Sequence, residues 1–235
     1  MLNIGNFIPR PIVPDTTLEE LPPLAKDHFY EGALDMAKDH GVDPTPDGIF
    51  RALSDFSAQM VGYYSGGRTP KVLYNHQYLP PKRGLLICGS VGTGKTVLTR
   101  FFEMILNHFL PEDRKFATIR CYDLMDSIVD EHGEHLSYYR QRIKGKHRIF
   151  DDLGPESNAQ VYGMPFGMKE ILIRRYDEWV DFGAMSIITT NLNGSREIAE
   201  RYGSRIEDRV TEMCDILIMD NKSRRKRNSA KVLER

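Results

Sequence analysis

The stretch "GSVGTGKT", residues 89–96, restricts what this chain can fold into more than any other part of its sequence. It fits the phosphate-loop pattern G-x-x-x-x-G-K-[ST], in which glycines let the backbone curl before a lysine and a hydroxyl. Such a loop works between a buried strand and a helix, because its N–H groups and the helix N-terminus converge on phosphate. Residues 83–89 are largely apolar, and residues 96–110 repeat apolar side chains at helical spacing. The sequence therefore predicts a nucleoside triphosphate site here.

The side chains of this loop have separate expected roles. Lys95 places a positive charge on the β- and γ-phosphates, and Thr96 offers its hydroxyl to Mg²⁺. We therefore expect ATP and Mg²⁺ as ligands. The expected phosphate-binding residues are Gly89, Ser90, Val91, Gly92, Thr93, Gly94, Lys95, Thr96 and Val97.

Short apolar runs alternate with helical patterns through the rest of the chain. The runs predict strands at residues 83–89, 117–123, 147–152, 185–191 and 215–220. Five strands that alternate with helices predict a parallel sheet covered on both faces, the α/β P-loop architecture.

The ends of the chain differ from this central pattern. Residues 1–25 hold five prolines and predict an extended arm, and two amphipathic helical patterns follow, before Pro80 and Pro81. We expect an N-terminal arm and helical partner-binding region at 1–80, and an ATPase domain at 81–235. Residues 222–235 carry seven basic residues and one Glu, a possible nucleic-acid contact or simply a solvated terminus.

Two acidic residues end the third apolar run, in "IFDDLG". Asp151 is placed to hold Mg²⁺, and Asp152 to orient and polarise the attacking water. Many ATPases of this kind carry Glu at the second position, and Asp is one methylene shorter. Either turnover is slow, or the nearby Glu156 shares the role.

Polar and basic residues complete the expected site. Asn191 ends the fourth run, where it can reach the γ-phosphate or its water, although Thr189 or Thr190 could share that position. Arg205 and Arg209 lie four residues apart, on one face of a predicted helix. Either they form a solvated face, or they reach the nucleotide of a neighbouring subunit in trans, which predicts a homo-oligomer.

Composition excludes several other classes of protein. No run approaches the roughly 18 apolar residues of a membrane helix, and the N-terminus lacks the order of a signal peptide. We therefore expect a cytoplasmic protein with no membrane contact. Cys88, Cys121 and Cys214 lie far apart in apolar runs, which favours buried side chains over a disulfide or zinc site.

The motifs together resemble the AAA+ ATPases of the DnaC-type helicase-loader and IstB-type transposition-helper group. "GSVGTGKT", "FDDLGPES", "SIITTN", "ERYGSRIEDR" and "KSRR" occur in that family's order, over about residues 80–227. The resemblance implies a Walker A motif at Lys95 and Thr96, and a Walker B pair at Asp151 and Asp152. It also implies the remaining roles: sensor 1 at Asn191, an arginine finger at Arg209, a second interface arginine at Arg205 and a sensor-like arginine at Arg224. We expect the usual helical lid to be missing or shortened, as in loaders.

This resemblance implies an ATPase that acts in DNA replication. Its expected partners are single-stranded DNA and a replicative helicase, which it loads, or a transposase. One alternative is a transposition helper on duplex DNA, and another is a ZapE-type chaperone ATPase. A small-molecule kinase is a further alternative, although the segment from "TTN" to "RYGSRIEDR" offers no acceptor pocket.

Overall fold

The computed structural model describes most of the expected ATPase domain and the two helices before it. The described residues are 26–44, 48–64, 82–130, 143–156, 159–161 and 164–219. The N-terminal arm and the basic segment 222–235 lie outside them, and so does Arg224.

In the described part of the chain, five parallel strands form one sheet. They are β1 (Gly84–Cys88), β2 (Ala117–Arg120), β3 (Arg148–Leu153), β6 (Ser186–Thr190) and β7 (Cys214–Ile218). Their order is β2-β3-β6-β1-β7, and every neighbouring pair is parallel. The predicted α/β architecture is confirmed, and the carboxyl ends of β1, β3 and β6 meet at one edge of the sheet.

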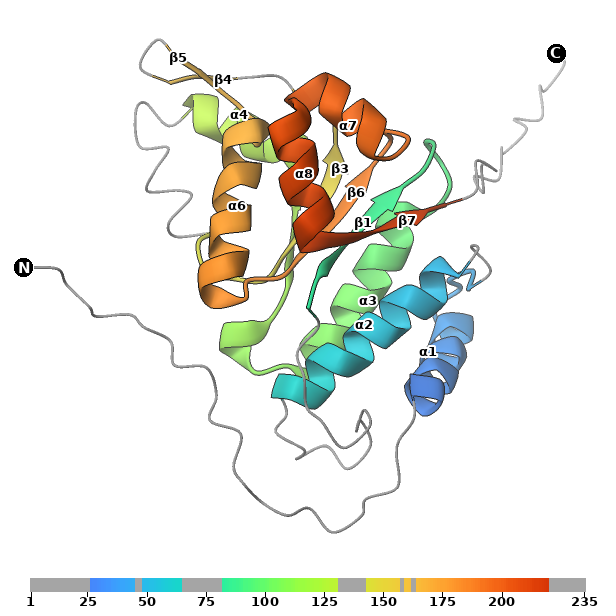
Figure 1. The fold of residues 1–235 in the computed structure, drawn as a ribbon. Helices are drawn as coiled ribbons and strands as arrows, with labels where there is room; N and C mark the ends of the chain where they lie inside the picture. Colours follow the sequence, from blue (N-terminus) through green and yellow to red (C-terminus); the bar gives the residue numbers. More distant parts are fainter. Residues whose placement is uncertain are drawn as a thin grey trace, which may run out of the picture.

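Successive residues of the strands face two separate cores, as the period of two along a strand requires. Leu85 and Ile87 of β1 pack into one cluster with α1 (Lys26–Asp39), α2 (Ile49–Tyr64) and α3 (Lys95–Phe109). Leu86 and Cys88 pack into the other. The helices on that second face are α4 (Cys121–Asp130), α6 (Met168–Phe182), α7 (Ser195–Tyr202) and α8 (Ser204–Met213). Figure 1 shows the sheet between these two sets of helices.

The two helices before the phosphate loop share the core of the sheet domain. The ring of Phe50 on α2 lies 6.0 Å from that of Phe101 and 5.0 Å from that of Phe102, both on α3. Tyr30 of α1 contacts Phe50 edge to face at 5.8 Å. The amphipathic face expected on α2 is therefore buried against α3, and that of α1 packs on α2.

The second strand is shorter than its sequence pattern predicts. We expected a strand over 117–123, but β2 ends at Arg120 and α4 begins at Cys121. Cys121, Leu124 and Met125 lie at helical spacing and are each at most 2% exposed, so a helix buries all three. A two-stranded antiparallel hairpin of β4 (Ala159–Val161) and β5 (Met164–Phe166), which we did not predict, follows β3. A short 3-10 helix, η1 (Glu112–Arg114), precedes β2.

Candidate nucleotide-binding site

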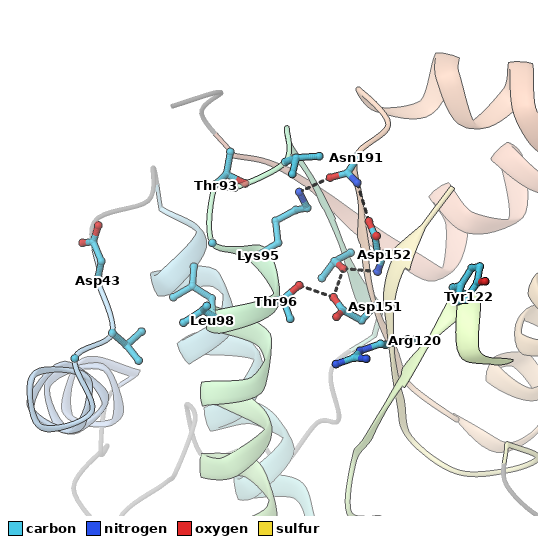
Figure 2. A pocket seen from close by; sticks show the side chains of 17 residues that line it. Asp43, Thr93, Lys95, Thr96, Leu98, Arg120, Tyr122, Asp151, Asp152 and Asn191 are labelled. Atoms are coloured by element: carbon cyan, nitrogen blue, oxygen red, sulfur yellow. Dashed lines mark hydrogen bonds between the residues drawn. The ribbon is translucent and has the colours of Figure 1, made fainter. Parts of the chain in front are cut away.

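A cavity of about 490 Å³ opens at the carboxyl edge of the sheet. This volume lies within the range of small-molecule sites, roughly 300–1,000 Å³. The phosphate loop, the start of α3 and the ends of β2, β3 and β6 form most of its wall (Figure 2). Gly41, Val42 and Asp43, which follow α1, contribute the far side.

Glycines of the phosphate loop lie where a residue with a side chain would strain the backbone or clash with a neighbour. Gly92 has a φ of 87° and Gly94 a φ of 104°, both in the region that favours glycine. A Cβ at Gly89 would lie 2.9 Å from the Cβ of Met219, closer than packed side chains allow. Gly94 directly precedes α3, so the N-terminus of α3 opens into the cavity and favours bound anions.

Lys95 lies at the base of this loop and is 7% exposed. Its Nζ donates hydrogen bonds to the carbonyl of Gly89, to the carbonyl of Ser90 at 3.0 Å and to Oδ1 of Asn191 at 2.9 Å. Burial lowers the pKa of Lys95, while the nearby carboxylates of Asp152 and Asp151 act in the opposite direction. A buried cation beside the loop is the group that a polyphosphate requires.

Asp151 is the buried acid of the site, at 4% exposed. Its Oδ1 accepts hydrogen bonds from the hydroxyl of Thr96 at 2.8 Å and from the hydroxyl of Thr189 at 2.7 Å. A carboxylate and a hydroxyl are the hard oxygen ligands that Mg²⁺ prefers. The residues present therefore fit a magnesium ion between Thr96 and Asp151.

Asp152 is exposed to the cavity because the strand is irregular at this point. The pairing of β3 with β6 shifts register between Phe150 and Leu153, and Asp152 has a φ of 62°. Its N–H donates to the hydroxyl of Thr189 at 2.9 Å. The strained backbone turns the Asp152 carboxylate into the cavity, beside that of Asp151 (Figure 2).

Asn191 is hydrogen-bonded both to Lys95 and to Asp152. Its Oδ1 accepts from Lys95, and its Nδ2 donates to Oδ1 of Asp152 at 2.7 Å. Figure 2 shows this chain of contacts from the phosphate loop through Asn191 to the end of β3. The residues expected from three separate motifs therefore meet in one hydrogen-bonded network.

The two predicted interface arginines lie on α8, outside the set of described residues that line the cavity. Arg205 is exposed. Arg209 is half-buried, with its guanidinium carbon 4.9 Å from the centre of the Tyr176 ring, and its Nη1 is buried without a hydrogen-bond partner among the described residues. Neither arginine is among the described residues that line the cavity.

Glu156, the alternative acid, is not in the cavity wall. It is 5% exposed and bonded to Tyr202 of α7. The expectation that it shares the role of Asp152 is not supported by this placement.

Several cavity residues were not predicted from the sequence. Arg120 and Tyr122 line the cavity at the end of β2, where Arg120 is the register partner of Asp151. The rule that strand ends line the ligand crevice would have identified Arg120 if the predicted strand had ended at Arg120 and not at Asp123. No motif marks the segment 41–43, which reaches the site because α1 packs on α2 and α2 packs on α3.

The strand order, the phosphate loop and the acidic end of β3 together define a P-loop fold of the AAA+ type. This α/β fold with its phosphate loop is the architecture that the sequence motifs implied.

Solved structures with this architecture have low sequence identity to the chain. A candidate primosome component from Streptococcus pyogenes serotype M3 is 15% identical, with a TM-score of 0.53 over 78% of this chain and 85% of that one. The DnaC helicase loader is 19% identical, with a TM-score of 0.44 over 59% of this chain and 79% of that one. AMPPCP-bound DnaA from Aquifex aeolicus is 19% identical, with a TM-score of 0.39 over 60% of this chain and 42% of that one.

Sequence comparison adds little to the structural likeness. Protein Ycf2 of Jasminum nudiflorum is 26% identical over an alignment of 121 residues, which covers 45% of this chain and 6% of that much longer protein. No protein-family model matches the chain. Among the described residues, no helix is long and apolar enough to cross a membrane.

Proposed function

We propose that this protein is a magnesium-dependent ATPase of the AAA+ type, with an active site completed by a second subunit. The observation that carries the proposal is the network that joins Lys95, Asn191 and Asp152. A lysine at a phosphate loop that is tied to an acid at the end of a strand suits hydrolysis, because one group binds phosphate and the other orients water.

Each residue of the site has a distinct task in this proposal. The loop N–H groups and Lys95 would bind the β- and γ-phosphates, and Thr96 and Asp151 would hold Mg²⁺, which would neutralise charge on the phosphate oxygens. Asp152 accepts a hydrogen bond from the attacking water and orients it. Asn191 fixes Asp152 and Lys95 relative to each other. The segment 41–43 and Leu98 form the side of the cavity that is left for the base.

Arg209 and Arg205 supply positive charge to the nucleotide of the neighbouring subunit. Their position on α8, away from the cavity of their own subunit, supports an action in trans. An arginine in this role stabilises the charge of the transition state and raises kcat by orders of magnitude. Hydrolysis then requires assembly.

We place the activity in DNA replication, as a loader of a replicative helicase onto single-stranded DNA. The fold shared with a candidate primosome component supports this placement, as do the motifs from "DDLG" to "RYGSRIEDR" and the basic segment 222–235. Affinity capture with a replicative helicase and with a transposase tests the partner. Retention of the transposase alone, with a preference for duplex DNA, would favour a transposition helper, and retention of neither would refute both partners.

The ATPase itself is tested by hydrolysis at rising protein concentration, with and without single-stranded DNA. We expect the rate per subunit to rise with concentration and with DNA, and to collapse in Arg209→Ala. Arg196→Ala is the matched control, because Arg196 of α7 is exposed and pairs only locally, with Glu200. A rate that is flat with concentration and equal in wild type and Arg209→Ala would refute an active site shared between subunits.

A further inference from the structure

The loop that follows Asp152 is tied to the end of α7 by buried hydrogen bonds. Glu156 accepts a hydrogen bond at Oε2 from the N–H of Gly154, at 2.6 Å, and at Oε1 from the hydroxyl of Tyr202. The backbone carbonyl of Glu156 accepts from Nη2 of Arg201 at 2.9 Å. Glu156 is 5% and Tyr202 8% exposed, so these contacts lie largely out of water.

Both ends of this connection lie next to residues of the proposed reaction. Gly154 is two residues beyond Asp152, and the carbonyl of the intervening Leu153 accepts from the hydroxyl of Thr190 at 2.7 Å. Tyr202 is the last residue of α7, and only Gly203 separates it from α8. The connection therefore runs from the acidic strand end to the helix that carries Arg205 and Arg209.

Neither segment has much freedom to move independently of the connection. Gly154 has a φ of 128°, which favours glycine, and the turn after β3 is held by the hydrogen bonds of Gly154 to Glu156 and of Leu153 to Thr190. α8 packs Ile206, Val210 and Met213 into the same core cluster as Leu153. Since packed cores shift between discrete arrangements, a small movement of the β3 turn would be passed on to α8.

We infer that Glu156 and Tyr202 are positioning residues that couple the nucleotide site of one subunit to the arginine helix it presents to the next. The inference rests on the function proposed above, since it gives α8 its role in trans. Glu156 contributes no chemistry at the nucleotide. It holds α7 and α8 at a fixed place relative to Asp152, and loss of the Tyr202 hydroxyl releases α8.

Two substitutions separate this role from a catalytic one. Tyr202→Phe removes the hydroxyl and keeps the ring, and we expect kcat to fall about tenfold or more while the affinity for an ATP analogue with Mg²⁺ changes by less than about twofold. Glu156→Gln keeps an acceptor for Gly154 and gains a donor toward the Tyr202 oxygen, so kcat should stay within about threefold of wild type. A general base at Glu156 would lose activity in Glu156→Gln.

Mixtures of variants show on which subunit the connection acts. Lys95→Ala subunits lack a working phosphate loop but present an intact α8, so mixing them with Tyr202→Phe subunits should recover hydrolysis. Arg209→Ala subunits lack the arginine that acts on the neighbouring site, so their mixture with Tyr202→Phe subunits should show no recovery above the low rates of the two single variants. Failure of the Lys95→Ala mixture to recover hydrolysis would overturn the inference.

Other outcomes distinguish failure of this inference from failure of the proposed function. If Arg209→Ala is inactive while Tyr202→Phe hydrolyses like wild type, the inference fails and the function stands. If wild type and Arg209→Ala hydrolyse alike, the shared active site fails and the inference fails with it. Amide hydrogen exchange of wild-type residues 204–213 provides a test that needs no variant. Slower exchange with the ATP analogue than with ADP is expected, and equal exchange would overturn the coupling.

Discussion

His147 makes the stability of the fold depend on pH, and this dependence can be measured directly. The side chain is 2% exposed, and its Nδ1 accepts a hydrogen bond from the N–H of Met185 at 3.0 Å. Nε2 therefore carries the proton and faces the hydroxyl of Tyr64 on α2, at 3.1 Å, while the ring stacks on Phe116. Burial lowers the pKa of His147 to about 3, and the charges of Arg114, Arg175 and Arg148 act in the same direction.

The sign and size of the effect follow from this shift. The unfolded chain binds a proton at this histidine below its ordinary pKa of about 6.5, whereas the folded chain does not until about pH 3. Folding stability is therefore fully present above pH 6.5 and falls by about 1.4 kcal/mol per pH unit between those values. Between pH 7.5 and 5.0 the loss from His147 alone is about 2 kcal/mol.

Urea unfolding followed by circular dichroism at pH 7.5 and 5.0 measures this loss. In His147→Asn an amide oxygen can accept from Met185 but does not titrate, so the variant should be less stable at pH 7.5 and lose about 2 kcal/mol less on acidification. His108→Asn, which replaces an exposed histidine on α3, is the control and should follow wild type. Equal acid sensitivity of wild type and His147→Asn would refute the reasoning.

Two further substitutions test the site and the core. Thr189→Val removes the hydroxyl that donates to Asp151 and accepts from the N–H of Asp152. A hydrogen bond to a charged group contributes about 1.5–3 kcal/mol, so kcat should fall roughly 10- to 100-fold. Thr189→Ser keeps the hydroxyl and should retain activity. Equal kcat values in the two variants, measured by phosphate release, would contradict this role. Arg175, with no exposed surface, pairs with Glu178 at 2.7 Å, so Arg175→Met should destabilise the fold by about 3–5 kcal/mol in urea unfolding. Arg175→Met with Glu178→Met should recover part of that loss, and no recovery would show that the ion pair is not the cause.

The parts of the site that the sequence predicts are those whose chemistry is tied to a strand end. Lys95, Asp151 and Asn191 each follow a buried apolar run, and parallel strands bring such ends to one edge of the sheet. Their convergence follows from topology alone, so no knowledge of packing is needed. The five strands and their alternation with helices could be predicted for the same reason.

The parts that the sequence does not predict depend on packing. Cys121 and the residues after it fit a strand locally, and only burial of Leu124 and Met125 on one face makes them a helix. Glu156 lies close to Asp151 and Asp152 in the sequence, which favours a role at the same site. Its hydrogen bond to Tyr202 joins residues 46 positions apart, so only the structure reveals it. The segment 41–43 reaches the cavity because α1 packs on α2, which in turn packs on α3. Such contacts join residues far apart in sequence, which local patterns do not record.

The wall of the cavity draws on residues from Gly41 to Asn191, most of the described chain. A cavity assembled from such distant segments exists only when the whole domain has folded, so a nucleotide that fits it binds the native state and not the unfolded chain. Mass action then makes the nucleotide a stabiliser, worth about 2.7 kcal/mol at a hundred times its dissociation constant. Because cells always contain nucleotides, the amount of folded protein would be linked to the same ligand that the proposed ATPase hydrolyses.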